Sequence, residues 1–181
     1  MKNRCFLAFL YGRMDMTQTK KLTLSAMFLA LGLLLPFLTG QIPTIGSMLL
    51  PMHIPVLLCG FIIGAPYGLL VGIITPLLRS MIFGMPPMLT AITMAFELGT
   101  YGFISGYLYN KLPKSIVNIY VSLIGAMFIG RVVWGMVSIL IYGMGSFGFS
   151  AFIAGGFSNA IPGILLQLVL IPILVKLADK K

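Results

Sequence analysis

The sequence predicts an all-α integral membrane protein, with six transmembrane helices in one bundle and both termini in the cytoplasm. Hydrophobic residues make up 59% of its 181 residues, charged residues make up 8% and the mean hydropathy is +1.07. A soluble globule of this length cannot bury so much apolar surface. Apolar runs also follow one another without an intervening polar domain, and lysine and arginine residues gather at alternate connections between the runs. The composition and the succession of apolar runs predict the fold class, and the positions of the lysine and arginine residues predict its orientation.

A membrane-crossing helix needs about 20 mostly apolar residues, and fewer when the helix is tilted or broken. On this criterion we expect helices over residues 22–39, 52–64, 66–83, 89–109, 116–142 and 152–177. The second run is too short to cross a membrane cleanly. We therefore expect it to be tilted, or to be extended by Leu49 and Leu50.

The basic residues predict which side of the membrane each connection occupies. Of the twelve lysine and arginine residues, all but Arg79 and Arg131 lie at one set of helix ends: Lys2, Arg4, Arg13, Lys20, Lys21, Lys111, Lys114, Lys176, Lys180 and Lys181. The three connections on the other side contain no charge. Because cytoplasmic loops carry the excess of lysine and arginine, both termini are predicted to be cytoplasmic. The net charge of +9 is then explained by topology and anionic membrane lipid, and we expect no nucleic-acid partner.

The predicted domain organisation is one membrane domain, residues 22–177, between cytoplasmic tails of residues 1–21 and 178–181. Residues 1–15 have a basic start and a short apolar patch, but no small-residue cleavage site of a signal peptide. Met16 is an alternative start, directly before the first helix. We expect an over-extended start or a short interfacial tail.

Ala26 and Ala30 form a ridge of small residues on the first predicted helix. Small residues four apart let a second helix approach closely in lipid. The ridge serves either internal packing or a partner helix. The following connection, residues 40–51, is uncharged and rich in turn formers, which is typical either of a lid over an outer site or of a plain surface loop.

His53 and Arg79 are the polar residues that stand out in the second and third predicted helices. His53 is the only histidine in the chain and has no second thiol, imidazole or carboxylate at ligand spacing, so we expect no metal site. It makes either one hydrogen bond at the membrane boundary or a ligand contact. Arg79 follows Gly68, Gly72 and Thr75 along one helix face. An ionisable side chain within a bilayer costs about 2.5–3.5 kcal/mol, which makes Arg79 a functional hypothesis.

Polar stripes at helical spacing mark the last three predicted helices. They comprise Thr90, Thr93, Glu97, Tyr101 and Ser105, then Arg131, Trp134, Ser138 and Tyr142, then Asn159, Gly163 and Gln167. Because polar groups avoid lipid, these three stripes and the helix face that carries Arg79 should converge inside the bundle and line a polar, aromatic-rimmed cavity open to the outside. Glu97 is the only acidic residue expected within the membrane. It pairs with Arg79, with Arg131 or with a ligand, and the sequence leaves these alternatives open.

No catalytic constellation is present in the sequence. We find no Ser/His/Asp set, H-E-x-x-H, G-x-S-x-G or P-loop. We therefore expect no enzymatic activity, no cofactor and no ATP site in this chain.

Several of these features together resemble the substrate-binding S component of energy-coupling factor (ECF) transporters. They are residues 20–23 (KKLT), the ridge of Ala26 and Ala30, six spans in a chain of this length, and the block of residues 50–87. The resemblance covers residues 16–181. It implies a subunit of the cytoplasmic membrane that captures a vitamin from outside and works with a transmembrane T component and two cytoplasmic ATPases. It also implies that Ala26 and Ala30 dock on the T component.

The resemblance leaves the substrate open. Residues 52–55 (MHIP) are similar to the start of cobalt and nickel S-type components, but they are internal here and no second histidine exists, so we reject metal transport. The predicted substrate-binding residues are His53, Arg79, Glu97, Tyr101, Arg131, Trp134 and Asn159. Two arginines against one carboxylate favour an anion or a neutral polar vitamin, such as pantothenate or pyridoxine, over a thiamine-like cation. The alternative function is a small structural or assembly membrane protein whose intramembrane charges only hold helices together.

Overall fold

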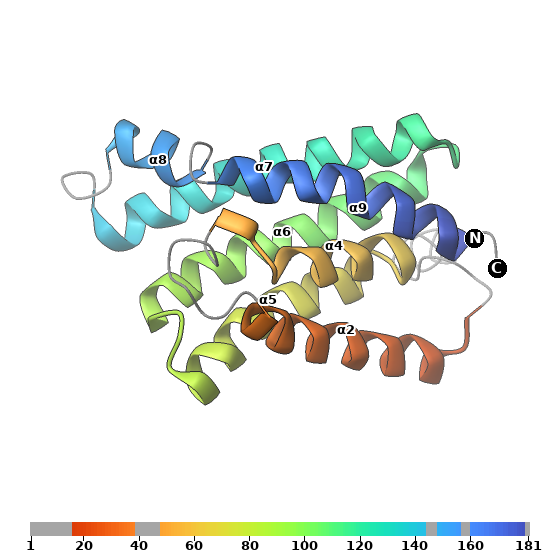
Figure 1. The fold of residues 1–181 in the computed structure, drawn as a ribbon, viewed down its shortest axis with the longest axis horizontal. Helices are drawn as coiled ribbons and strands as arrows, with labels where there is room; N and C mark the ends of the chain where they lie inside the picture. Colours follow the sequence, from red (N-terminus) through yellow and green to blue (C-terminus); the bar gives the residue numbers. More distant parts are fainter. Residues whose placement is uncertain (1–15, 39–47, 144–147, 157–159, 180–181) are drawn as a thin grey trace, which may run out of the picture.

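The computed structural model describes residues 16–38, 48–143, 148–156 and 160–179, and its regular structure within these ranges is helical. The helices are α2 (Gln18–Leu38), α4 (His53–Ile62), α5 (Ala65–Phe83), α6 (Met88–Lys111), α7 (Ile116–Tyr142), α8 (Phe149–Gly156) and α9 (Ile161–Asp179). Figure 1 shows their arrangement as an elongated bundle.

Four stretches are long and apolar enough to cross a membrane: α2, α5, α7 and the stretch Phe152–Asp179, which includes α9. The prediction of an all-helical membrane protein is therefore confirmed. α6 has 24 residues, but its polar side chains keep it outside this group. The count of six transmembrane helices and the cytoplasmic location of the termini stay predictions.

Two predicted boundaries can be compared with the local backbone of the structure. Leu50 has φ +50°, a conformation that a helix cannot continue through, so the expectation that Leu49 and Leu50 extend α4 is wrong. Within the last predicted helix, residues 152–177, the described helices are α8 and α9, and residues 157–159 lie outside the described residues. α8 ends on Gly155 and Gly156, and Pro162 is the second residue of α9, where its missing N–H is tolerated.

From α2 through α4, α5, α6 and α7 to α9, each helix runs opposite to the one before it, so the start of α2 and the end of α9 lie at the same end of the bundle (Figure 1). Two side-chain hydrogen bonds tie helices together at this end. The hydroxyl of Tyr67 in α5 donates to Gln18 Oε1 in α2 at 2.8 Å, and the hydroxyl of Tyr109 in α6 donates to the carboxylate of Asp179 in α9. This arrangement supports the prediction that both tails lie on one side of the membrane.

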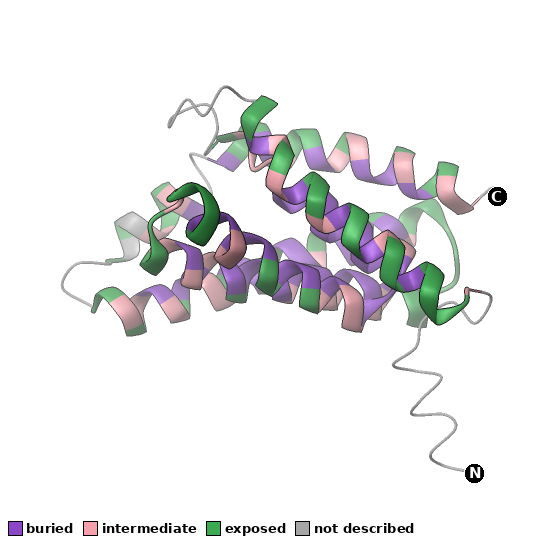
Figure 2. Cartoon of the chain, turned by 90° about the horizontal axis from the view of Figure 1, so that it is seen from below, coloured by how far each residue is buried: buried purple, intermediate pink, exposed green. Residues whose placement is uncertain are grey.

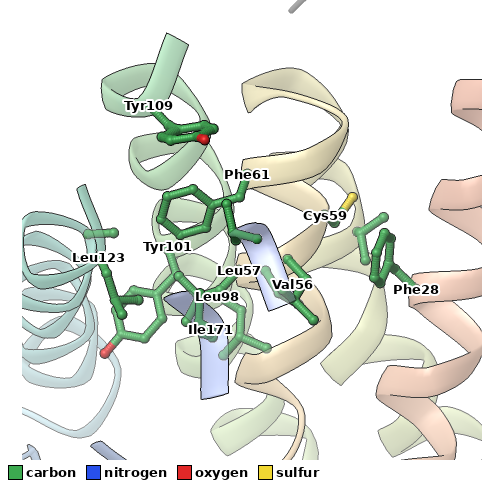
Figure 3. Close-up of a cluster of buried hydrophobic side chains, with 14 of the residues drawn as sticks. Phe28, Val56, Leu57, Cys59, Phe61, Leu98, Tyr101, Tyr109, Leu123 and Ile171 are labelled. Carbon is green, nitrogen blue, oxygen red and sulfur yellow. The ribbon is translucent and has the colours of Figure 1, made fainter. Parts of the chain in front are cut away.

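The short helix α4 lies at the centre of the bundle and packs against α2, α5, α6 and α9. All of its residues except Ile54 and Ile62 are buried. In Figure 3 the side chains of Val56 and Leu57 lie among those of neighbouring helices. Apart from His53, α4 is thus apolar on every side, because protein encloses it.

Glycines allow α4, α5 and α6 to approach one another closely. A Cβ atom at Gly102 of α6 would lie 2.2 Å from the carbonyl oxygen of Gly68 in α5, and one at Gly60 of α4 would lie 2.4 Å from the carbonyl oxygen of Gly102. The predicted face with Gly68 and Arg79 is buried. The part of this face that carries Gly68 and Gly72 packs directly on α6 and does not line a cavity.

The outside of the bundle is apolar and several polar side chains are buried. Figure 2 shows buried residues where the helices meet and exposed residues on the outer faces. The exposed side chains include Leu34, Phe128 and Leu140, whereas Glu97 and Gln167 are buried. This distribution suits a lipid environment, and it agrees with the prediction that polar stripes face inward.

Candidate functional site

The polar centre of the bundle is Glu97 of α6. Its Oε1 atom lies 2.9 Å from Nη1 of Arg131 in α7 and 3.5 Å from Nε2 of His53 in α4. All three residues are at most 5% exposed. We call His53, Glu97, Tyr101 and Arg131 the Glu97 cluster, because three helices bring these predicted site residues together.

The break before α4 positions His53. The left-handed Leu50 ends the preceding segment, and the backbone N–H of His53 donates to the Leu50 carbonyl oxygen at 3.1 Å. α4 therefore starts at His53, with the imidazole beside α6. The His53 ring meets the ring of Tyr101 edge-on, with ring centroids 5.2 Å apart.

Tyr101 lies one helical turn after Glu97 and packs on the backbone of α7. A Cβ atom at Gly130 would lie 2.1 Å from two ring carbons of Tyr101, so only glycine fits at this position. Arg131 follows Gly130 directly and reaches Glu97. The contact of Tyr101 with Gly130 therefore sets the register between α6 and α7 at the ion pair.

The cluster holds more hydrogen-bonding capacity than its members use. Within the described residues, both ring nitrogens of His53 and the Nε and Nη2 atoms of Arg131 have no hydrogen-bond partner. Glu97 Oε1 also lacks a well-aligned hydrogen bond, despite its 2.9 Å ion-pair contact. Buried polar groups are normally paired, and leaving one unpaired costs about 1–3 kcal/mol. The formal charges of Glu97 and Arg131 cancel. The cluster thus offers donors and acceptors with balanced charge.

Two buried side chains of the predicted polar stripes also lack hydrogen-bond partners among the described residues. They are Ser138 of α7, through its Oγ, and Gln167 of α9, through both amide atoms. Both belong to the predicted polar stripes, but neither was among the predicted site residues. Helical spacing was the signal that could have found them.

Trp134 borders the cluster from the side of α8. Its ring stacks on Phe152 of α8, with centroids 6.1 Å apart and an interplanar angle of 26°. A Cβ atom at Gly156 would lie 3.5 Å from Trp134 and 3.9 Å from Cδ of Arg131. The end of α8 therefore covers the turn of α7 that carries both predicted site residues.

Arg79 lies in a different set of contacts. Its Nη1 atom donates to the carbonyl oxygen of Leu33 in α2 at 2.6 Å. Its guanidinium lies 4.8 Å from the ring centroid of Phe37 and 5.5 Å from that of Phe83. Of the two arginines, Arg131 is therefore the one paired with Glu97 in the described structure. Asn159, the remaining predicted site residue, lies outside the described residues.

The two alanines predicted to dock on a partner, Ala26 and Ala30, are exposed on α2. The buried face of this helix carries Ser25, Phe28 and Gly32 instead. Internal packing of the described helices therefore does not cover the alanine ridge.

One comparison with known proteins gives a match. The model of a family described as "ECF transporter, substrate-specific component" matches residues 20–175, a range that includes the whole Glu97 cluster. No curated protein and no solved structure matches the chain.

Proposed function

We propose that this chain, which belongs to the family of ECF transporter substrate-specific components, binds a small water-soluble vitamin at the Glu97 cluster. Family membership makes it the substrate-specific membrane subunit of an ECF transporter, a binding subunit and not an ATPase. The observation that supports the site is the set of unpaired buried donors and acceptors on His53, Glu97 and Arg131. A ligand that bonded to these atoms would offset their desolvation.

The charge balance of the cluster supports a neutral polar ligand. Because Arg79 is held against α2, the surplus positive charge that favoured an anion does not belong to the Glu97 cluster. A pyridoxine-like ring could bond to the polar atoms and stack on Tyr101 or Trp134. A pantothenate-like anion is the second candidate, because Arg131 retains two unpaired donor atoms.

The family implies a T component and two ATPases as partners, and we place the complex in the cytoplasmic membrane with the ligand captured from outside. The exposed ridge of Ala26 and Ala30 supports docking of α2 on the T component, because small exposed residues permit close helix approach.

The alternative function is supported by one observation, the 2.9 Å pair between α6 and α7. If this pair served only to hold the two helices together, the protein would bind no vitamin and would have a structural or assembly role.

A ligand panel tests the proposal. Purified protein would be titrated with pyridoxine, pantothenate, thiamine and riboflavin, and both thermal unfolding and binding heat would be measured. We expect pyridoxine, or failing that pantothenate, to bind and stabilise the fold. A ligand at about 100 times its Kd adds about 2.7 kcal/mol to the free energy of unfolding. If no vitamin in the panel binds or shifts the Tm, the proposal is wrong. Mass spectrometry beforehand establishes that the purified protein carries no co-purified small molecule, so occupied sites do not cause a negative result.

A further inference from the structure

Gln167 is a fully buried polar residue with no role in the fold described so far. Its exposed fraction is 0%, and neither Nε2 nor Oε1 has a hydrogen-bond partner within the described residues. A primary amide without a partner in an apolar interior is expensive. This cost indicates that the Gln167 amide has a role other than packing.

The position of Gln167 along the bundle follows from its neighbours one turn away. A Cβ atom at Gly163 would lie 2.5 Å from the carbonyl oxygen of Met48, just before α4. Ile171, one turn after Gln167, belongs to the same buried cluster as Val56 and Leu57 of α4 (Figure 3). α4 and α9 run in the same direction (Figure 1). Along the bundle, Gln167 therefore lies at the level of His53, the first residue of α4.

Gln167 also lies on the inward face of α9. Gly163, Gln167 and Ile171 are spaced four apart and all are buried, whereas Leu165 and Val169 are exposed. The amide thus belongs to the same interior, and to the same level of the bundle, as the Glu97 cluster.

We propose that Gln167 is a substrate-contact residue that determines specificity, and this inference rests on the proposed function. A carboxamide presents an acceptor oxygen beside a donor nitrogen. It therefore pairs best with a ligand that carries a donor and an acceptor on neighbouring groups. The ring hydroxyl beside the hydroxymethyl group of pyridoxine, and the hydroxyl beside the amide carbonyl of pantothenate, are such pairs. A carboxylate on the ligand supplies acceptors only, so it bonds to the amide nitrogen and leaves the amide oxygen without a donor.

The experiment compares Gln167→Leu with wild type in the same ligand panel. Leucine has a similar volume and no polar atom, so the free variant should unfold at the same Tm or a higher one. Its affinity for the vitamin that binds wild type should fall about tenfold to a hundredfold, because the ligand's polar pair is left without partners. Gln167→Glu keeps the size but loses the donor nitrogen, and its affinity should fall as well.

Ser122→Ala is the matched control. Ser122 of α7 is also buried and its Oγ has no hydrogen-bond partner among the described residues, but it lies more than two helical turns before Arg131. Its variant should bind like wild type. Gln167→Asn retains the amide on a shorter side chain, and we expect it to fold but to bind the vitamin more weakly than wild type. This variant tests the assignment of Gln167 if the leucine variant fails to fold.

The outcomes separate the two proposals. If wild type binds a vitamin and Gln167→Leu binds it equally well, the assignment of Gln167 is wrong and the proposed function stands. Tighter binding by Gln167→Glu, or an equal loss in Ser122→Ala, also overturns the assignment. If wild type binds no vitamin, the proposed function itself fails.

Discussion

Glu97 and Arg131 form a buried ion pair whose partners depend on each other. Each charge pays a desolvation cost that the other offsets, so removing one partner leaves an uncompensated charge in the bundle. Replacing both by uncharged residues of similar size can be nearly neutral for stability. Single and double variants of this pair can therefore distinguish its effect on stability from its effect on ligand binding.

We expect Glu97→Gln and Arg131→Met each to lower the free energy of unfolding by about 3–5 kcal/mol. The double variant should recover most of this stability, yet bind the vitamin at least tenfold more weakly than wild type, because the ligand loses its charged hydrogen-bond partners. Thermal unfolding and calorimetric titration of the four proteins measure both effects. Wild-type affinity in the double variant would mean that the pair only holds α6 and α7 together.

At the scale of helices, Arg79 joins the ends of α2 and α5. Pro36 within α2 offers no N–H to the carbonyl oxygen one turn earlier, and Arg79 supplies a donor to the neighbouring carbonyl of Leu33. Phe37 and Phe83 lie on the guanidinium and meet each other edge-on, with centroids 4.9 Å apart. These contacts clamp the two helices near the end of the bundle opposite the tails.

We therefore expect Arg79→Gln to lower the free energy of unfolding by about 1–3 kcal/mol, through loss of the charged hydrogen bond and the cation–π contacts. Vitamin affinity should stay within about twofold of wild type. Arg79→Lys, which keeps the charge but loses the planar fork, should recover only part of the stability. An unchanged Tm together with a more than tenfold loss of affinity would return Arg79 to the substrate site, where the sequence placed it.

At the scale of the whole molecule, binding and transport are expected to use different surfaces. The Glu97 cluster is enclosed by α4, α6 and α7, whereas Ala26 and Ala30 lie exposed on α2. A bulky residue on the alanine ridge should therefore block a partner helix without reaching the ligand.

The double variant Ala26→Leu and Ala30→Leu should bind the vitamin like wild type but lose uptake in cells that also produce the T component and ATPases. Uptake of labelled vitamin and co-purification of the T component measure the effect. Val117→Leu and Val121→Leu, an exposed pair with the same spacing on α7, is the matched control and should transport normally. Normal uptake by the alanine-ridge variant would refute the docking assignment.

Helix prediction succeeded where the signal is local in sequence. The predicted helix over residues 116–142 coincides with α7, because a long apolar run bounded by a basic connection specifies its own ends. It failed at Leu50, where one left-handed backbone conformation interrupts an apolar run. Hydropathy averages over a window and does not register such breaks.

Hydropathy and helical periodicity are properties of the chain alone, and they were sufficient to predict a helical membrane protein with its polar residues on inward stripes. The pairing of Glu97 with Arg131 followed from the packing of α6 on α7. Arg79 and Arg131 are residues of the same type, and the position of a residue along its helix does not specify which neighbouring helix it meets. Arg79 does not reach Glu97 because glycines pack α5 closely on α6 and because Arg79 bonds to α2. The tertiary structure also buries Gln167 without a hydrogen-bond partner among the described residues.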